Sequence, residues 1–116
     1  MPKVASVNCS SSNHTCYQGE LKASFERLVN EFGPPTSGPD NYKVDAEWVI
    51  EFEGGYIATI YNWKDGKNYL GEDGLELDQI TDWHIGGKSK RVVGWLDDLI
   101  NNSWPIFDEI RQESQF

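Results

Sequence analysis

The sequence predicts an α+β fold, in which a small antiparallel sheet of three strands is packed on one face by an N-terminal helix and one or two C-terminal helices. Two patterns predict it: apolar residues follow a helical period near both ends of the chain, and they alternate with polar residues in the middle. The apolar content is only 38%, but five Trp, five Tyr and five Phe can each bury a large area. These aromatics favour a folded chain over a disordered acidic one.

The first helix is expected to begin after Thr15, which is spaced with Gln18 as a capping box, and to end at Phe32. Gly33 and the two prolines that follow it stop the helix. Its apolar stripe repeats at helical spacing, and its members are Leu21, Phe25, Leu28, Val29 and Phe32.

Residues 45–63 predict an antiparallel hairpin with Gly54 and Gly55 at its turn. The first strand alternates strictly, so one face is apolar and the other is largely acidic. Its apolar positions are Ala46, Trp48, Ile50 and Phe52. The aromatics expected mainly in the core are Trp48, Phe52, Trp63, Trp83 and Trp95, whereas Tyr56, Tyr61 and Trp104 are left undecided.

The later elements follow from the same patterns. Residues 64–78 predict a long acidic loop with a short helical turn, and residues 79–85 predict the third strand. Residues 90–101 have helical apolar spacing, and Ser103 can cap a last short helix.

A chain of 116 residues predicts one domain, which we place at residues 15–116 after a flexible arm at residues 1–14. Residues 4–7 could add a short strand. No apolar run reaches the roughly 18 residues of a membrane helix, and no signal peptide opens the chain, so a cytoplasmic protein is expected. There Cys9 and Cys16 are expected to be free thiols.

Basic charge is concentrated at one place in a chain of net charge −9. Residues 40–82 hold eleven acidic and three basic residues, whereas residues 83–91 hold three basic residues and no acidic one. Two glycines at a junction between a strand and a helix let backbone N–H groups approach an anion. The candidate anion-binding or ligand-binding residues are His84, Gly86, Gly87, Lys88, Ser89, Lys90 and Arg91.

This segment resembles the end of a phosphate-binding P-loop at Gly87-Lys88-Ser89. Asp82 stands where such a loop needs its first glycine, so nucleotide hydrolysis is not expected. The alternative to an anion site is a tight surface turn with solvated lysines.

The acidic face of the hairpin is a second candidate surface, and its partner-binding residues are Asp45, Glu47, Glu51 and Glu53. Alternate residues of a strand lie about 6.6–6.8 Å apart, close to the spacing of phosphates along one DNA strand. The surface would then mimic nucleic acid toward a protein with a basic surface. The alternative is the ordinary solvent side of a one-faced sheet.

Catalytic and metal sites are not expected. Asp82 and His84 could form a general-base pair, but no oxyanion donors are identifiable beside them, and a hydrolase is the weakest hypothesis. His14 near the two cysteines lacks zinc spacing, and the acidic loop lacks the residue order of a calcium loop. No cofactor is expected.

Several segments together resemble a family of small, mostly uncharacterised bacteriophage proteins. They include Tyr42-Lys43-Val44-Asp45-Ala46-Glu47-Trp48, Ala58-Thr59-Ile60-Tyr61-Asn62-Trp63-Lys64 and Trp83-His84-Ile85-Gly86-Gly87, and the resemblance covers about residues 17–100. The resemblance implies a phage origin and the host cytoplasm. We therefore expect an acidic, non-enzymatic accessory protein that binds and inhibits a host protein, including in an anti-defence role.

The alternative is a protein that sequesters a phosphate-bearing small molecule, such as a defence signalling nucleotide. Membrane association is not expected, and direct binding of nucleic acid is disfavoured by the net charge. An open sheet edge and exposed aromatics also allow a homo-oligomer.

Overall fold

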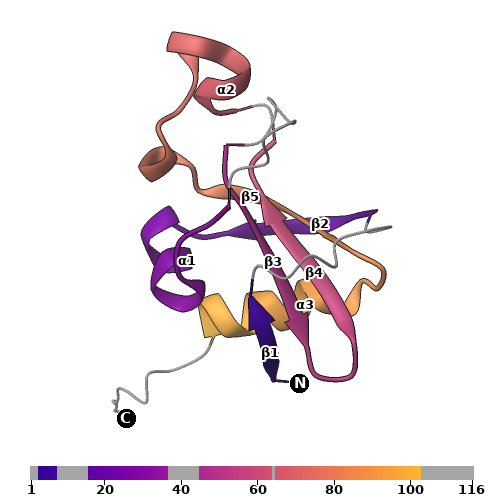
Figure 1. Cartoon of the computed structure of the whole chain (residues 1–116). Coiled ribbons are helices and arrows are strands. Elements are labelled where there is room, and N and C mark those ends of the chain that lie inside the picture. Colours follow the sequence, from indigo (N-terminus) through magenta and orange to yellow (C-terminus); the bar gives the residue numbers. More distant parts are fainter. Residues whose placement is uncertain (1–2, 8–15, 37–44, 64, 103–116) are drawn as a thin grey trace.

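The computed structural model describes residues 3–7, 16–36, 45–63 and 65–102 (Figure 1). They form an open antiparallel sheet of five strands in the order β1-β3-β4-β5-β2. The strands are β1 (Val4–Val7), β2 (Cys16–Lys22), β3 (Glu47–Phe52), β4 (Tyr56–Tyr61) and β5 (Asp82–Gly87). The prediction of a three-stranded sheet is therefore wrong, although the α+β class broadly fits.

The additional strands lie at the two edges of the sheet. Val4–Val7 pair with β3, and Cys16–Lys22 pair with β5. Of the arm expected at residues 1–14, residues 4–7 thus belong to the sheet, and residues 8–14 lie outside the described residues.

The prediction of a helix beginning after Thr15 is wrong, because Cys16–Lys22 is a strand and helix α1 covers only Phe25–Phe32. Leu21 is buried from β2, and this shows why the pattern misled: a residue that fits a helical stripe also fits the inward face of a strand. Pairing with β5 selects the strand, and Gly19 lets β2 lie close to α3 (Arg91–Asp97), since a Cβ there would meet the side chain of Val93 at 3.1 Å.

Helix α1 has its own cap. The Ser24 hydroxyl accepts a hydrogen bond from the Arg27 N–H at 3.0 Å, which satisfies one of the free donors of the first turn. Gly33 ends the helix with φ at 83°, as the sequence predicts.

The predicted hairpin is confirmed as β3 and β4, which pair in register from Glu47 with Tyr61 to Phe52 with Tyr56. Gly54 and Gly55 adopt φ values of 91° and 85°, a region that favours glycine, and this explains the tight turn.

The core lies between one face of the sheet and two helical segments, α1 and α3 (Arg91–Asp97), which continues as a π-helical turn over Asp98–Asn102 (Figure 1). Trp48 and Trp83 are fully buried with ring centroids 5.4 Å apart, as their pattern predicts. Their indole N–H groups donate to the carbonyls of Gly33 and Ala23, so both large rings are buried with their polar atom satisfied. The last short helix, expected from Ser103, lies outside the described residues.

An acidic excursion joins β4 to β5 and contains α2 (Lys67–Leu70) and two 3-10 turns at Gly71–Asp73 and Leu77–Gln79 (Figure 1). Asn62 connects the start of this excursion to the residues that precede β3. The side-chain oxygen of this fully buried residue accepts from the N–H groups of Asp45 and Ala46, and its nitrogen donates to carboxylates of Asp45 and Asp65. No helix among the described residues has both the length and the apolar character needed to cross a membrane.

The third predicted strand is displaced along the chain. Leu77–Gln79 is a 3-10 turn, and β5 runs from Asp82 to Gly87, so the two glycines are inside the strand and not in a turn. The reason is crowding on both faces: a Cβ on Gly86 would lie 2.5 Å from Thr59 Oγ1, and one on Gly87 would lie 2.9 Å from Val92.

Candidate binding site on the outer face of the sheet

The helices pack on one face of the sheet, and we call the opposite face the outer face. Strand pairing places four side chains there in one row, because each residue is the direct partner of the next. Glu20 on β2 lies opposite His84 on β5, His84 lies opposite Tyr61 on β4, and Tyr61 lies opposite Glu47 on β3. Directly opposed residues have Cβ atoms about 4.5–5.5 Å apart, so the row is continuous, with a carboxylate at each end.

The middle of this row opens into an apolar hollow of about 300 Å³. We call it the aromatic hollow, and it is lined by Tyr17, Tyr61, Trp63 and His84. Tyr17 is 54% exposed and Trp63 is 38% exposed, which is unusual for large aromatic residues in a domain with a full core. Trp63 was expected in the core, and the structure places it at the surface instead.

The rings of the aromatic hollow have a defined arrangement. Trp63 and His84 lie 25° from parallel with centroids 6.5 Å apart. Tyr61 stands across both, at 82° to Trp63 and 65° to His84, with centroid distances of 6.2 and 5.6 Å. Tyr17 contacts the same imidazole from β2 with centroids 5.0 Å apart. We call the nearly parallel rings of Trp63 and His84 the walls of the hollow, and Tyr61 stands at a steep angle to both.

The floor beside the hollow is flat because Gly86 carries no side chain. Tyr17 and Thr59 are its partners on the neighbouring strands, and the Thr59 hydroxyl occupies the space above it. Thr59 is only 3% exposed, so this polar residue contributes to the floor without facing solvent.

Glu47 closes one end of the row as a half-buried carboxylate. Burial raises the pKa of this carboxyl above its ordinary value. Burial, the charge of Glu47 and the nearby Tyr17 together raise the pKa of Tyr61. Across residues 3–7, 16–36, 45–63 and 65–102, the Glu47 side chain forms no ion pair. A partly desolvated carboxylate without a counter-cation is a feature of binding sites more than of stabilising networks.

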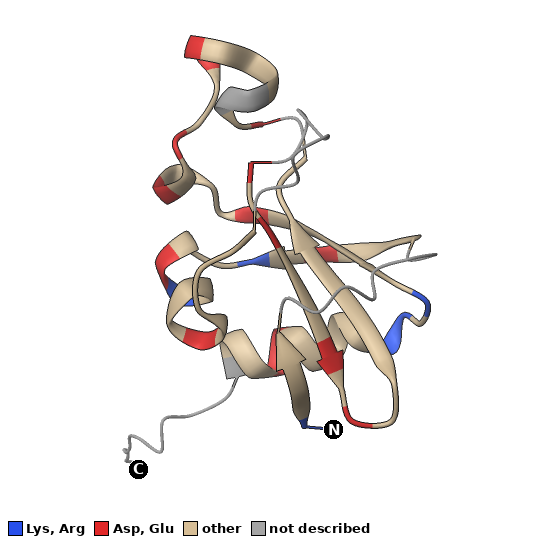
Figure 2. Cartoon of the chain, viewed as in Figure 1, with Lys and Arg blue, Asp and Glu red and all other residues tan. Residues whose placement is uncertain are grey.

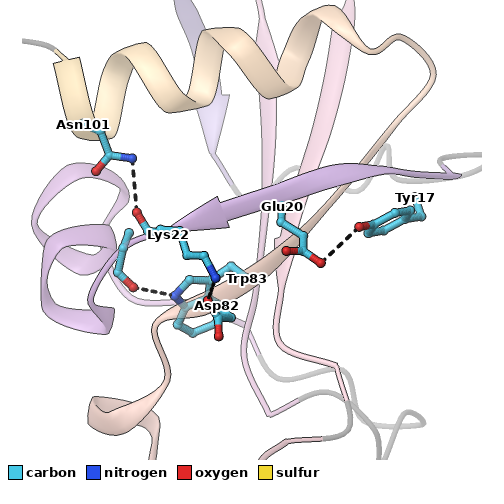
Figure 3. Close-up of polar contacts among 7 residues, drawn as sticks. Tyr17, Glu20, Lys22, Asp82, Trp83 and Asn101 are labelled. Atoms are coloured by element: carbon cyan, nitrogen blue, oxygen red, sulfur yellow. Dashed lines mark hydrogen bonds and ion pairs between the residues drawn. The ribbon is translucent and has the colours of Figure 1, made fainter.

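At the opposite end, Glu20 accepts a hydrogen bond from the Tyr17 hydroxyl at 3.3 Å (Figure 3). Figure 3 shows both side chains on the side of β2 away from α3. Lys22 and Asp82 form an exposed ion pair one row further along the sheet. Lys22, the described cation two residues from Glu20 on the same strand, is thus paired with Asp82, and the Glu20 carboxylate forms no ion pair within residues 3–7, 16–36, 45–63 and 65–102.

The structure separates the residues of the predicted anion site. Lys88 and Lys90 are exposed in the connection between β5 and α3, and Arg91 is exposed as the first residue of α3 (Figure 2), whereas Gly86 and Gly87 are buried in the sheet. His84 belongs to the aromatic hollow, about 13 Å along the strand from Lys88. The Ser89 hydroxyl accepts from the Arg91 N–H at 3.2 Å and is thus used within the turn.

The four predicted partner-binding acids are also not one exposed row. Asp45 is engaged with Asn62, and Glu53 lies beyond the end of β3 in the exposed hairpin turn. Glu51 accepts a hydrogen bond from the Ser6 hydroxyl at 3.3 Å. Only Glu47 borders the aromatic hollow.

The structure does not support the general-base pair of the hydrolase hypothesis. Asp82 forms an ion pair with Lys22, and no hydrogen bond joins Asp82 to His84 among the described residues. The described residues contain no group of three side chains suited to a metal ion, and Cys9 and His14 lie outside them. Cys16 is a free, exposed thiol at the start of β2.

The site residues that sequence reasoning did not assign are Tyr17, Glu20, Trp63 and Tyr61, the last of which was left undecided between core and surface. Tyr17 and Glu20 were assigned to a helix, which would have separated them from His84, and only the pairing of β2 with β5 brings them together. Comparison with family models, curated proteins and solved structures finds no match to this chain, so its site rests on its own geometry.

Proposed function

We propose that this protein is a non-enzymatic binding protein whose outer face receives a basic segment of a partner protein. One observation carries the proposal: an open aromatic hollow lies in a row whose two ends are the carboxylates of Glu20 and Glu47. Aromatic faces attract cations, and carboxylates beside them add charge and hydrogen-bond acceptors.

The charge of the whole chain supports the same partner. The net charge of −9 favours encounter with a basic surface and disfavours nucleic acid or phosphate ligands at this face. Exposed Tyr and Trp side chains are also the residue types that most often dominate binding energy at protein interfaces.

Together with the resemblance to small phage proteins, this makes a host protein the proposed partner, inhibition the proposed result and the host cytoplasm the proposed location. The alternative, a phosphate-bearing ligand at Lys88, Lys90 and Arg91, has less geometric support because Gly86 and Gly87 are buried inside β5 and the Arg91 N–H already donates to the Ser89 hydroxyl. A nucleotide added to the protein tests it directly: chemical-shift changes confined to residues 87–91 would favour that alternative over our proposal.

A peptide titration tests the proposal. The probe is a Gly/Ser peptide with three spaced basic residues, and the control peptide carries three glutamates instead. We expect only the basic peptide to bind, with NMR shifts at Tyr61, Trp63 and His84. Glu47→Gln should weaken binding about fivefold to tenfold, since it removes a charged hydrogen-bond acceptor.

The matched control variant is Glu72→Gln, which removes one acidic charge from the exposed turn at Gly71–Asp73. It should leave the affinity within about twofold. Equal losses in the two variants would reduce the effect to net charge and contradict a site at the outer face, as would equal binding of the basic and acidic peptides.

A further inference from the structure

We infer that the aromatic hollow selects one residue of the basic segment, an arginine, whose guanidinium enters between the rings of Trp63 and His84. This inference rests on the proposed function and adds the identity of the side chain that is recognised. It follows from the shape of the hollow, the order of its charges and the way in which arginine differs from lysine.

The shape favours a flat group. The ring planes of Trp63 and His84 are 25° from parallel. A ligand between these two rings would therefore contact the face of each ring, whereas perpendicular rings would offer it one face and one edge. A planar group between two rings needs about 7 Å, because each face contact takes about 3.5 Å. The centroid distance of 6.5 Å is an upper limit on the separation of the two ring planes, so one ring must turn outward to admit the group. Trp63 is free of the regular strand for such a movement, because it lies just beyond the end of β4 with 38% of its surface exposed.

The third ring sets the direction of entry. Tyr61 belongs to β4 and stands at a steep angle to both walls, so the sheet bounds the inner side of the site. A ligand must therefore enter from the solvent side, with its flat head inward and its stem outward. A long flexible side chain with a planar terminus meets this requirement.

The charges at the ends of the row decide between a cation and a neutral or anionic ring. Glu47 is the direct neighbour of Tyr61, and Glu20 is the direct neighbour of His84. A nucleobase could stack in the same gap, but it would bring its phosphates toward these carboxylates. A guanidinium instead places its N–H donors toward them.

Arginine suits this site better than lysine. The guanidinium is planar, stacks on aromatic faces and has five donors, so it can contact both walls and reach a carboxylate at its edge. The lysine ammonium is a compact, strongly hydrated charge, which gains less from two parallel ring faces and loses more water on entering the hollow. The site should therefore discriminate between two residues of equal charge.

Four pentapeptides test the inference: Gly-Ser-Xaa-Ser-Gly, capped at both ends, with arginine, lysine, citrulline or norleucine at the centre. Binding to the full chain is measured by NMR titration up to millimolar peptide. We expect arginine to bind roughly tenfold more tightly than lysine. Citrulline, which is flat but neutral, should lose most of the affinity, and norleucine should not bind.

Two variants assign the preference to the walls. Trp63→Leu should bring arginine and lysine to similar affinity, whereas Trp63→Phe should keep part of the preference. Tyr69→Leu removes an aromatic ring of similar exposure from α2, outside the hollow, and should change neither affinity.

The possible failures are distinguishable. Equal binding of the arginine and lysine peptides, both weakened by Glu47→Gln, would overturn the arginine inference and leave the proposed function in place. Tight binding of the citrulline peptide would overturn the role of positive charge in both the proposed function and the arginine inference. Absence of shifts at the hollow with all four peptides, together with no binding of the longer basic peptide, would overturn both as well.

Discussion

Asn62 is the single residue on which the base of the acidic excursion depends. Its side chain is fully buried and makes four hydrogen bonds, two from backbone N–H groups and two to carboxylates. The backbone of Gly66 packs directly against this cluster, since a Cβ there would lie 2.1 Å from the Asp45 carboxylate and 2.9 Å from the Asn62 amide.

We therefore expect Asn62→Ala to lower the free energy of unfolding by about 2–4 kcal/mol, because two buried N–H groups lose their acceptor. Urea denaturation measures the change. Asn62→Asp is a second variant. Its carboxylate keeps the two hydrogen bonds from the backbone N–H groups but repels Asp45 and Asp65, so its loss in free energy of unfolding should become smaller as the pH falls. A loss below about 0.5 kcal/mol in Asn62→Ala would contradict the central role of this side chain.

Glu47 illustrates a residue whose contribution to binding is opposed by its effect on stability. Burial raises the pKa of its carboxyl above the ordinary value of 4.5, so the charged form is disfavoured in the folded protein. The penalty applies fully above the raised pKa and disappears as the pH falls below the ordinary value.

Glu47→Gln should accordingly be more stable than the natural protein at pH 7.5, and the two should converge as the pH approaches 4. Denaturation at both pH values measures this, with Glu53→Gln in the exposed turn as the matched control. If Glu47→Gln is less stable at pH 7.5, the carboxylate is stabilised by the fold and is not available for a partner.

At the scale of elements, two glycines of neighbouring segments should respond to the same change in opposite directions. A Cβ on Gly94, in the exposed middle of α3, meets nothing within 4 Å, so Gly94→Ala should add about 1 kcal/mol through helix propensity. A Cβ on Gly86 would press on Thr59 Oγ1, so Gly86→Ala should cost about 1–3 kcal/mol. Thermal melts of the two variants give the comparison, and a shift of the same sign in both would contradict it.

The elements also show where sequence reasoning succeeds. The hairpin of β3 and β4 was predictable because its alternation and its turn glycines agree with each other. The helix over Arg91–Asp97 was predictable from apolar spacing, and so was the burial of Trp48 and Trp83.

The failures have one physical cause, which is contact between distant parts of the chain. Residues 16–22 satisfy a helical stripe and a strand equally well through Leu21, and only pairing with β5 selects the strand. Gly86 and Gly87 suggested a turn, but their role is to admit Thr59 and Val92. The site was missed for the same reason, since no local signal joins Tyr17 to His84 and Trp63.

For the whole molecule, the separation of its charges gives a distinguishing test. The basic residues Lys88, Lys90 and Arg91 lie together where β5 passes into α3 and do not line the aromatic hollow, whereas acidic residues lie on several other elements (Figure 2). Changing all three to Ala makes the net charge more negative. The three residues do not belong to the core, so the melting temperature should stay within a few degrees.

We expect this triple variant to bind the basic peptide at least as tightly as the natural protein, and to associate faster at low salt. Stopped-flow measurements at 50 and 300 mM salt give the rates. A large loss of affinity in the triple variant would instead move the working surface to these three basic residues.

The order of the strands bears on how the chain is made. β1 and β2 precede the other strands in the sequence, lie at opposite edges of the sheet and pair with β3 and β5. Lys22 is translated sixty residues before its partner Asp82. A ribosome that has not yet reached β5 thus carries a chain in which only the outer strand β1 and the hairpin can pair, while the strand that supplies Tyr17 and Glu20 has no partner. The recognition surface therefore forms only after β5 has been synthesised, when β2 and β4 both gain their partner.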